Sequence, residues 1–185
     1  MKNEKVIFLD RDGVINENRD NDYIKEWDEF KFLPKAKEAI RTLTDASWGI
    51  IIITNQAGVG KGIMSDQAVR DINARMIEEI EAYGGKIKTV YYCPHRPEED
   101  CECRKPKPGM LFNAAREFNI EFSESYLIGD NITDIKCGSQ VGCTTILVKT
   151  GLGSEHIERR SQWPVEPDYI ASDLSEAVEF ILIQR

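Results

Sequence analysis

The sequence contains only two histidines among its 185 residues, which leaves little material for a catalytic triad. His95 lies among cysteines and His156 lies in a polar segment, so a serine or cysteine hydrolase is disfavoured. Basic residues are fewer than acidic residues, 24 against 32, and the resulting formal net charge of −8 repels polyanions. We therefore expect no nucleic-acid partner, and an anionic substrate would need a local positive site.

Long apolar runs are absent, as is the apolar core of a secretion signal after Met1. We expect a soluble, cytoplasmic monomer with no membrane partner. The sequence also lacks a nucleotide-binding loop. Gly62 follows Lys61 where a Walker loop needs serine or threonine, and Ile63 replaces the third glycine of a dinucleotide motif.

Short apolar runs alternate along the chain with amphipathic helical patterns. The strand-like runs cover residues 6–9, 50–53, 89–92, 126–128, 145–148 and, at an edge, 169–170. Helical patterns occupy about 36–43, 65–80, 108–118, the residues after 133, and 173–181. This order predicts an α/β fold, with a doubly wound, Rossmann-like, mostly parallel sheet and helices on both faces.

The same pattern indicates how many domains the chain forms. Residues 13–49 hold little more than a loop and one helix, so we expect no separate cap domain. The length suits a single domain over residues 1–185. The polar stretch 151–167 is predicted to be a long loop.

Polar residues follow four of the predicted strands, where parallel α/β sheets bind ligands. These residues are Asp10-Arg11-Asp12, Thr54-Asn55-Gln56, Cys93-Pro94-His95 and Gly129-Asp130. Arg104-Lys105-Pro106 precedes the helix that begins near Pro108.

The two carboxylates of Asp10 and Asp12 suit a nucleophile and a general acid and base. With Asp130 they also predict an oxygen-rich magnesium site, with Asp10, Asp12 and Asp130 as ligands. Lys105 and Thr54 supply a positive charge and a hydroxyl donor for the oxygens of a transferring phosphoryl group. Asp134 has two interpretations: it orients Lys105 or a metal-bound water, or it is an ordinary acid in the first turn of a helix.

Cysteine is present in an odd number, five, and three of the five crowd around one histidine. Cys93, His95, Cys101 and Cys103 offer three thiolates and one imidazole, a set that suits a tetrahedral, structural zinc ion. We therefore predict a zinc-binding loop at 93–103. The two remaining cysteines, Cys137 and Cys143, are expected to be small buried apolar side chains.

Four ordered segments together resemble the motifs of the haloacid dehalogenase superfamily. They are Asp10-Arg11-Asp12-Gly13, Thr54-Asn55-Gln56, Arg104-Lys105-Pro106-Lys107-Pro108, and Gly129-Asp130 with Asp134. The resemblance spans most of the chain. It implies a magnesium-dependent phosphatase in which Asp10 forms an aspartyl-phosphate intermediate.

The zinc loop narrows the resemblance to the heptose 1,7-bisphosphate phosphatases. The strings that carry it are Cys93-Pro94-His95, Cys101-Glu102-Cys103-Arg104-Lys105-Pro106, Pro108-Gly109-Met110-Leu111 and Gln56-Ala57-Gly58. The family removes the C7 phosphate of the sugar during synthesis of nucleotide-activated heptose for surface polysaccharide. On this resemblance the substrate-binding residues are Arg11, Asn55, Gln56, Ala57, Asn131 and, for the retained phosphate, Arg104.

Three alternatives stay open from the sequence. Histidinol-phosphate phosphatases share the zinc loop and are the nearest rival. An open site would also admit a polynucleotide end-phosphate, although the negative charge argues against it. A non-catalytic phosphate-binding module would have no need of a proton shuttle, and the presence of Asp12 argues against it.

Overall fold

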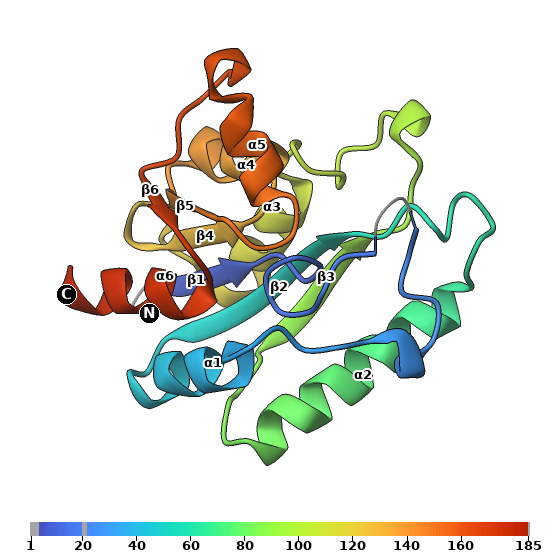
Figure 1. Cartoon of the computed structure of the whole chain (residues 1–185), viewed down its shortest axis with the longest axis horizontal. Helices are drawn as coiled ribbons and strands as arrows, with labels where there is room; N and C mark the ends of the chain where they lie inside the picture. The colour runs from blue at the N-terminus through green and yellow to red at the C-terminus, as the bar shows by residue number, and fades with distance from the viewer. Residues whose placement is uncertain (1–3, 20–21, 185) are drawn as a thin grey trace.

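A computed structural model describes residues 4–19 and 22–184. Its centre is one six-stranded, all-parallel sheet with the strand order β3-β2-β1-β4-β5-β6 (Figure 1). The strands are β1 (Val6–Leu9), β2 (Gly49–Asn55), β3 (Thr89–Cys93), β4 (Tyr126–Gly129), β5 (Thr144–Val148) and β6 (Tyr169–Ala171). The prediction of a doubly wound sheet is confirmed.

Six α-helices accompany the sheet in the described part of the chain. They are α1 (Ala36–Asp45), α2 (Asp66–Ala82), α3 (Gly109–Phe118), α4 (Ile132–Val141), α5 (Gly153–Glu158) and α6 (Leu174–Ile183). Four 3₁₀ turns are η1 (Trp27–Glu29), η2 (Pro97–Glu99), η3 (Phe122–Glu124) and η4 (Arg160–Gln162). Among these described helices, none combines the length and apolar character that crossing a lipid bilayer requires.

The prediction of a long loop at 151–167 was wrong, because α5 and η4 occupy much of it. The segment is polar, and each helix is too short to show a helical period. Tertiary contacts hold it instead. Gly153 lies so close to the sheet that a Cβ there would stand 1.7 Å from the carbonyl oxygen of Val148. The Trp163 indole donates a hydrogen bond of 2.9 Å to the carbonyl of His156.

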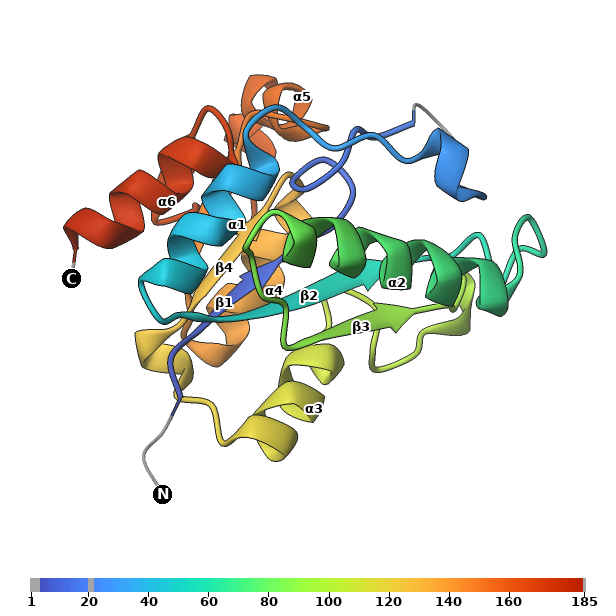
Figure 2. The same ribbon diagram turned by 90° about the horizontal axis from the view of Figure 1, so that it is seen from below.

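The two faces of β1 lie in two separate apolar layers. Ile7 and Leu9 pack in the layer formed with α1, α2 and α6, whereas Val6 and Phe8 pack in the layer with α3 and α4. Figure 2 shows α1 and α2 on one side of the sheet and α3 on the other. Alternate residues of a strand point to opposite faces of the sheet. Because an apolar layer covers each face, all four side chains are fully buried. Cys137 and Cys143 belong to the second layer, as expected for buried apolar side chains.

The segment between β1 and α1 forms no separate cap domain in its described residues. Ile24 and Phe30 are buried in the same layer as α1 and α2. The rings of Trp27 and Phe30 stack with their centres 5.0 Å apart. The segment therefore packs on the core and leaves the carboxyl ends of the strands uncovered by a second domain.

The strand order places a switch point beside β1. The chain runs outward from β1 to β2 and β3, and then returns to place β4 on the other side of β1. In doubly wound sheets the crevice at such a point binds ligands. Asp10 follows β1 and Asp130 follows β4, so the two carboxylates flank this crevice.

Ser125 ties the start of β1 to the turn before β4. Its buried hydroxyl accepts a hydrogen bond of 3.1 Å from the Val6 amide and donates one of 2.7 Å to the Glu121 carbonyl. We predict that Ser125→Ala lowers the free energy of unfolding by about 1–3 kcal/mol, because the Val6 amide loses its partner in a buried strand. Urea denaturation monitored by circular dichroism measures the change.

Ser123→Ala is the matched control, since its hydroxyl is exposed and bonds to the Glu121 side chain on the surface. It should change the free energy of unfolding by less than about 0.5 kcal/mol. Equal losses in the two variants would show that the Ser125 hydroxyl has no special role.

Candidate active site

A hollow of about 370 Å³ lies at the carboxyl ends of the strands. Its lining residues are Asp10, Asp12, Asn18, Thr54, Asn55, Arg104, Lys105, Pro106, Asp130, Asn131, Thr133 and Leu152. A wider groove of about 1140 Å³ lies at the opposite end of the sheet, where strands begin, and contains none of the predicted site residues. The chemistry predicted from the sequence therefore gathers in the smaller hollow.

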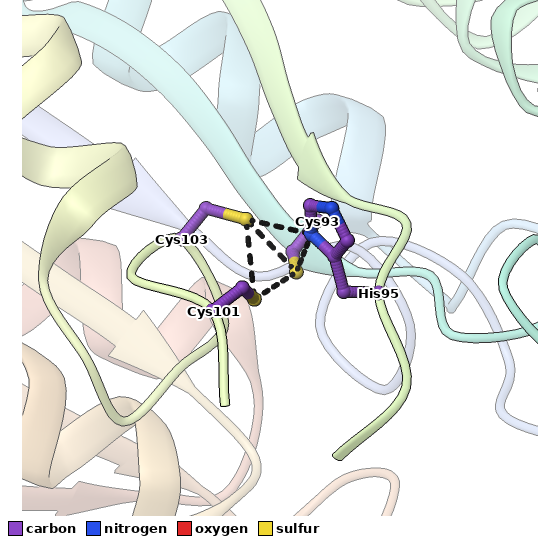
Figure 3. A group of neighbouring side chains, drawn as sticks. All are labelled: Cys93, His95, Cys101 and Cys103. Carbon is purple, nitrogen blue, oxygen red and sulfur yellow. Dashed lines mark hydrogen bonds between the residues drawn. The ribbon is translucent and has the colours of Figure 1, made fainter. Parts of the chain in front are cut away.

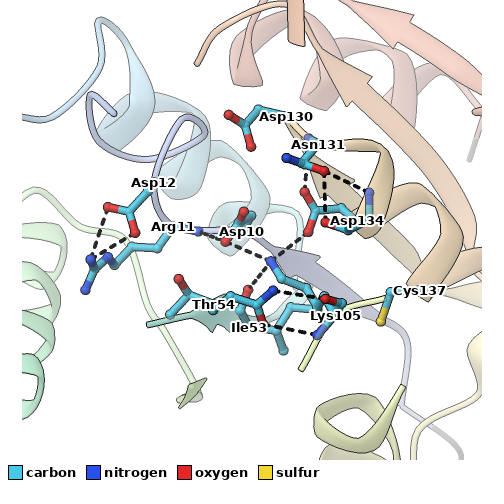
Figure 4. Close-up of polar contacts among 12 residues, drawn as sticks. Asp10, Arg11, Asp12, Ile53, Thr54, Lys105, Asp130, Asn131, Asp134 and Cys137 are labelled. Atoms are coloured by element: carbon cyan, nitrogen blue, oxygen red, sulfur yellow. Dashed lines mark hydrogen bonds and ion pairs between the residues drawn. The ribbon is translucent and has the colours of Figure 1, made fainter. Parts of the chain in front are cut away.

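The Lys105 ammonium is the buried positive charge of this hollow. It lies 2.9 Å from Asp10 Oδ1 and 2.6 Å from Asp134 Oδ1, and it donates to the Ile53 carbonyl at 2.9 Å (Figure 4). Burial by itself would lower the pKa of Lys105, but the two carboxylates raise it above its ordinary value. The lysine is thus held charged between the two carboxylates. Asp134 fits both interpretations, because its Oδ1 pairs with Lys105 while its Oδ2 accepts from the Asn131 amide in the first turn of α4.

Three carboxylates crowd around this single ammonium. Oxygen atoms of Asp10, Asp130 and Asp134 all lie within 4.8 Å of one another. Burial raises the pKa of Asp10 to about 7, with Lys105 opposing the rise and Asp134 adding to it. Burial, followed by repulsion from Asp10 and Asp134, also raises the pKa of Asp130. A divalent cation would relieve this repulsion, and the oxygen set is the kind that magnesium prefers.

Asp130 is held in place by groups that the sequence did not reveal. Its Oδ2 accepts hydrogen bonds from Asn18 Nδ2 at 3.0 Å and from the Leu152 amide at 2.7 Å. Gly13 and Gly151 both have positive φ, and a Cβ at either position would stand 2.1 Å from Asp130 Oδ2. The sequence did offer one signal for these contacts, which is a glycine shortly after β1, Gly13, and another shortly after β5, Gly151. Neither position has room for a side chain.

The Asp12 carboxylate faces away from the other three. Arg11 Nη2 donates to both of its oxygens at 3.0 and 2.9 Å, Asn16 donates to Oδ1 at 2.9 Å, and Gln56 donates to Oδ2 at 2.7 Å. Figure 4 shows it turned toward the Arg11 guanidinium. Burial favours the neutral acid, but Arg11 and these hydrogen bonds together lower the pKa of Asp12. Asp12 therefore rests as an ionised base at the wall of the hollow.

The residues expected to bind substrate fall into two groups. Asn55, Arg104 and Asn131 line the hollow, whereas Arg11 and Gln56 are buried beside it. The Arg11 side chain is fully buried in its ion pair with Asp12.

Buried Ala57, like Arg11 and Gln56, is not part of the wall. Asn55 clamps the Lys105 backbone through two hydrogen bonds of 3.1 Å. The Asn131 side chain accepts from the Thr133 amide and caps α4. Arg104 Nη1 donates to the His95 carbonyl at 3.4 Å. Among the residues predicted to bind substrate, Arg104 is the cation that lines the hollow.

The four predicted zinc ligands converge on one point (Figure 3). The three sulfur atoms of Cys93, Cys101 and Cys103 lie 3.1 to 3.5 Å apart, and His95 Nδ1 lies 3.3 Å from Cys103 Sγ. Ligands at about 2.3 Å from a tetrahedral zinc would lie roughly 3.7 Å apart, so the cluster needs only a slight expansion to hold the ion. The cysteines are free thiols.

The chain resembles known proteins over nearly its whole length. A family described as HAD-hydrolase-like matches residues 102–177. The D-glycero-beta-D-manno-heptose-1,7-bisphosphate 7-phosphatase of Pseudomonas aeruginosa is 40% identical over 148 residues, which cover 80% of this chain and 83% of that protein. The enzyme of the same name from Bordetella bronchiseptica is 34% identical, covering 96% of this chain and 98% of that protein.

Solved structures agree with the sequence comparison. The D,D-heptose 1,7-bisphosphate phosphatase of B. bronchiseptica, complexed with magnesium and phosphate, matches with a TM-score of 0.91 and 34% identity, covering 98% of this chain and 99% of that one. The corresponding enzyme of Burkholderia thailandensis matches with a TM-score of 0.74 and 26% identity, covering 97% and 99%. The chain therefore belongs to the D-glycero-D-manno-heptose-1,7-bisphosphate 7-phosphatase family of HAD-like hydrolases.

Proposed function

We propose that this protein removes the C7 phosphate of D-glycero-D-manno-heptose 1,7-bisphosphate, acting in the cytoplasm as a single HAD-like phosphatase domain. The observation that carries the reaction is the Asp10 carboxylate at the switch point, 2.9 Å from the buried Lys105 ammonium. The choice of sugar rests on the family of relatives.

The first half of the reaction forms a bond between an Asp10 carboxylate oxygen and the phosphorus of the phosphate on C7. The bond from phosphorus to the sugar oxygen breaks, its electron pair stays with the sugar, and Asp12 in its protonated form supplies the proton to that oxygen. Lys105 and the Thr54 hydroxyl face the phosphoryl oxygens and offset their negative charge.

The second half releases the phosphate from Asp10. Water attacks phosphorus, the bond to the Asp10 oxygen breaks, and Asp12 takes the proton that the water loses. Asp10 returns to a carboxylate and Asp12 to an acid, so one water is consumed for each phosphate released. Arg11 and the hydrogen bonds that lower the pKa of Asp12 favour the ionised form that takes this proton. The free enzyme with Asp12 ionised therefore has to take up one proton with the substrate before the first step.

Asp10 and Asp130, with Asp12 through its backbone, would hold magnesium, and Asp134 stands beside them. When bound, the ion offsets the negative charge of the carboxylates and of the phosphoryl group. The relative that was solved with magnesium and phosphate supports this assignment. Lys105 alone leaves the group of three acids with an excess of negative charge.

The retained phosphate at C1 would bind Arg104. This residue lines the hollow beside Lys105 and follows directly on the zinc loop. A planar guanidinium suits bidentate binding of a phosphate. The zinc loop at 93–103 would fix the position of Arg104, since Arg104 donates to the carbonyl of the ligand His95.

A turnover panel tests the proposed substrate. Purified protein with magnesium should release phosphate from heptose 1,7-bisphosphate with the highest kcat/KM, and both C1 anomers should be assayed. The panel should include histidinol phosphate and an oligonucleotide with a terminal phosphate. A higher kcat/KM on either of these would replace the proposed sugar with the rival substrate.

Asp10→Asn should abolish turnover, because an amide oxygen is too weak a nucleophile to take the phosphoryl group. Acid-quenched wild-type protein should carry an added phosphoryl group by mass spectrometry, and the variant should not. Asp45→Asn is the matched control, since Asp45 is exposed at the end of α1 and should leave turnover unchanged. Substantial turnover by Asp10→Asn would exclude the covalent mechanism.

Removal of zinc should loosen the loop and lower activity indirectly. Cys101→Ser should lose bound zinc by elemental analysis and become sensitive to protease within residues 94–104, because the loop has no apolar core of its own. Cys143→Ala is the control, because this buried cysteine lies outside the cluster and its loss should leave the zinc content unchanged. Full protease resistance after zinc loss would contradict a structural metal.

A further inference from the structure

The Gln56 side-chain amide joins two residues of the proposed mechanism. Gln56 is only 1% exposed, and its backbone amide donates to the Cys93 carbonyl at 2.7 Å. Its Nε2 donates to Asp12 Oδ2 at 2.7 Å and to Thr54 Oγ1 at 2.9 Å. A primary amide nitrogen has two hydrogens, so these two bonds use both.

The bond to Thr54 decides which way that hydroxyl can donate. A threonine hydroxyl has one hydrogen and two lone pairs. Because an amide nitrogen donates and does not accept, Thr54 Oγ1 is the acceptor of this bond and its own hydrogen is not used in it. Its hydrogen is left for another acceptor, and Thr54 lines the hollow together with Asp10. Gln56 thereby keeps Thr54 available as a donor to a phosphoryl oxygen.

The bond to Asp12 fixes the carboxylate from the side of β2. Arg11 and Asn16 hold it from the β1 side, and Arg11 is itself fixed by a hydrogen bond of 3.0 Å to Asn73 on α2. Of these donors to Asp12, Gln56 also contacts Thr54. Its amide therefore sets the position of the acid and base relative to the phosphate-binding hydroxyl.

We propose that Gln56 is a positioning residue that aligns Asp12 and Thr54, and that it does not contact the substrate. The proposal rests on the proposed phosphatase mechanism. Gln56 is not part of the wall of the hollow, and both of its amide hydrogens are committed to these two residues. Its loss should therefore impair turnover more than binding.

Gln56→Met tests this role, because it keeps most of the volume and removes both donors. On a sugar phosphate, kcat should fall on the order of 100-fold, the scale of a misplaced general acid, while KM changes less than about threefold. On p-nitrophenyl phosphate, the pre-steady-state rate of nitrophenolate release should fall about tenfold or less, because nitrophenolate leaves without needing a proton and this step does not use Asp12 as a base.

The leaving-group comparison separates positioning from other roles. Equal losses on the two substrates would indicate a general structural defect, and a rise confined to KM would indicate substrate contact; either result overturns the proposal. Gln184→Met is the matched control. Gln184 is exposed at the opposite end of the sheet and should leave both activities unchanged.

A crystal structure of the variant gives a second, independent test. The Asp12 carboxylate should turn away from residue 56 in Gln56→Met, or in Gln56→Glu if the first variant does not fold. An unmoved Asp12 overturns the proposal. If wild-type protein rejects heptose bisphosphate but hydrolyses another alkyl phosphate, the proposed substrate fails and the Gln56 comparison is made on that alkyl phosphate. If the wild type hydrolyses no phosphate ester, the proposed function fails, and the position of Asp12 in the crystal structure of the variant alone tests the role of Gln56.

Discussion

The Lys105 ammonium, buried between Asp10 and Asp134, is the interaction on which the rest of the site depends. A buried charge is costly unless it is paired, and removing one partner of such a pair typically costs about 3–5 kcal/mol. Lys105 therefore needs its two carboxylates, and they need it. Two hydrogen bonds with Asn55 hold the Lys105 backbone near the switch point, and residues 93–103 lead directly to it.

The same crowding of charge explains why the site needs a cation. One ammonium cannot balance three neighbouring carboxylates, and burial, with repulsion from the neighbouring acids added to it, raises the pKa of Asp10 and of Asp130. Asp12 is treated differently. Its own guanidinium partner, Arg11, lowers its pKa and separates it from the other acids. Carboxylates two residues apart thus have opposite environments, because Asp10 faces two other acids and Asp12 faces a guanidinium.

Sequence patterns predicted much of the fold, because buried parallel strands and amphipathic helices have clear periods. They failed at α5 and η4, where single contacts such as Trp163 with the His156 carbonyl replace periodicity. For the site, motif order placed Asp10, Thr54, Lys105 and Asp130 in one hollow. The grip of Asn18 and Leu152 on Asp130 was missed, since hydrogen bonds between distant segments leave no local pattern.

By itself the sequence determined which groups are present: the acids at strand ends, one lysine before a helix, and the three cysteines and one histidine spaced for a metal. These follow from residue type and spacing along the chain. Only the tertiary structure decided what each group faces. Gln56 and Arg11 were predicted from the sequence to bind substrate, yet both are buried and donate hydrogen bonds to Asp12. The physical reason is that the direction of a side chain depends on packing between β1, β2 and α2, which no single segment encodes.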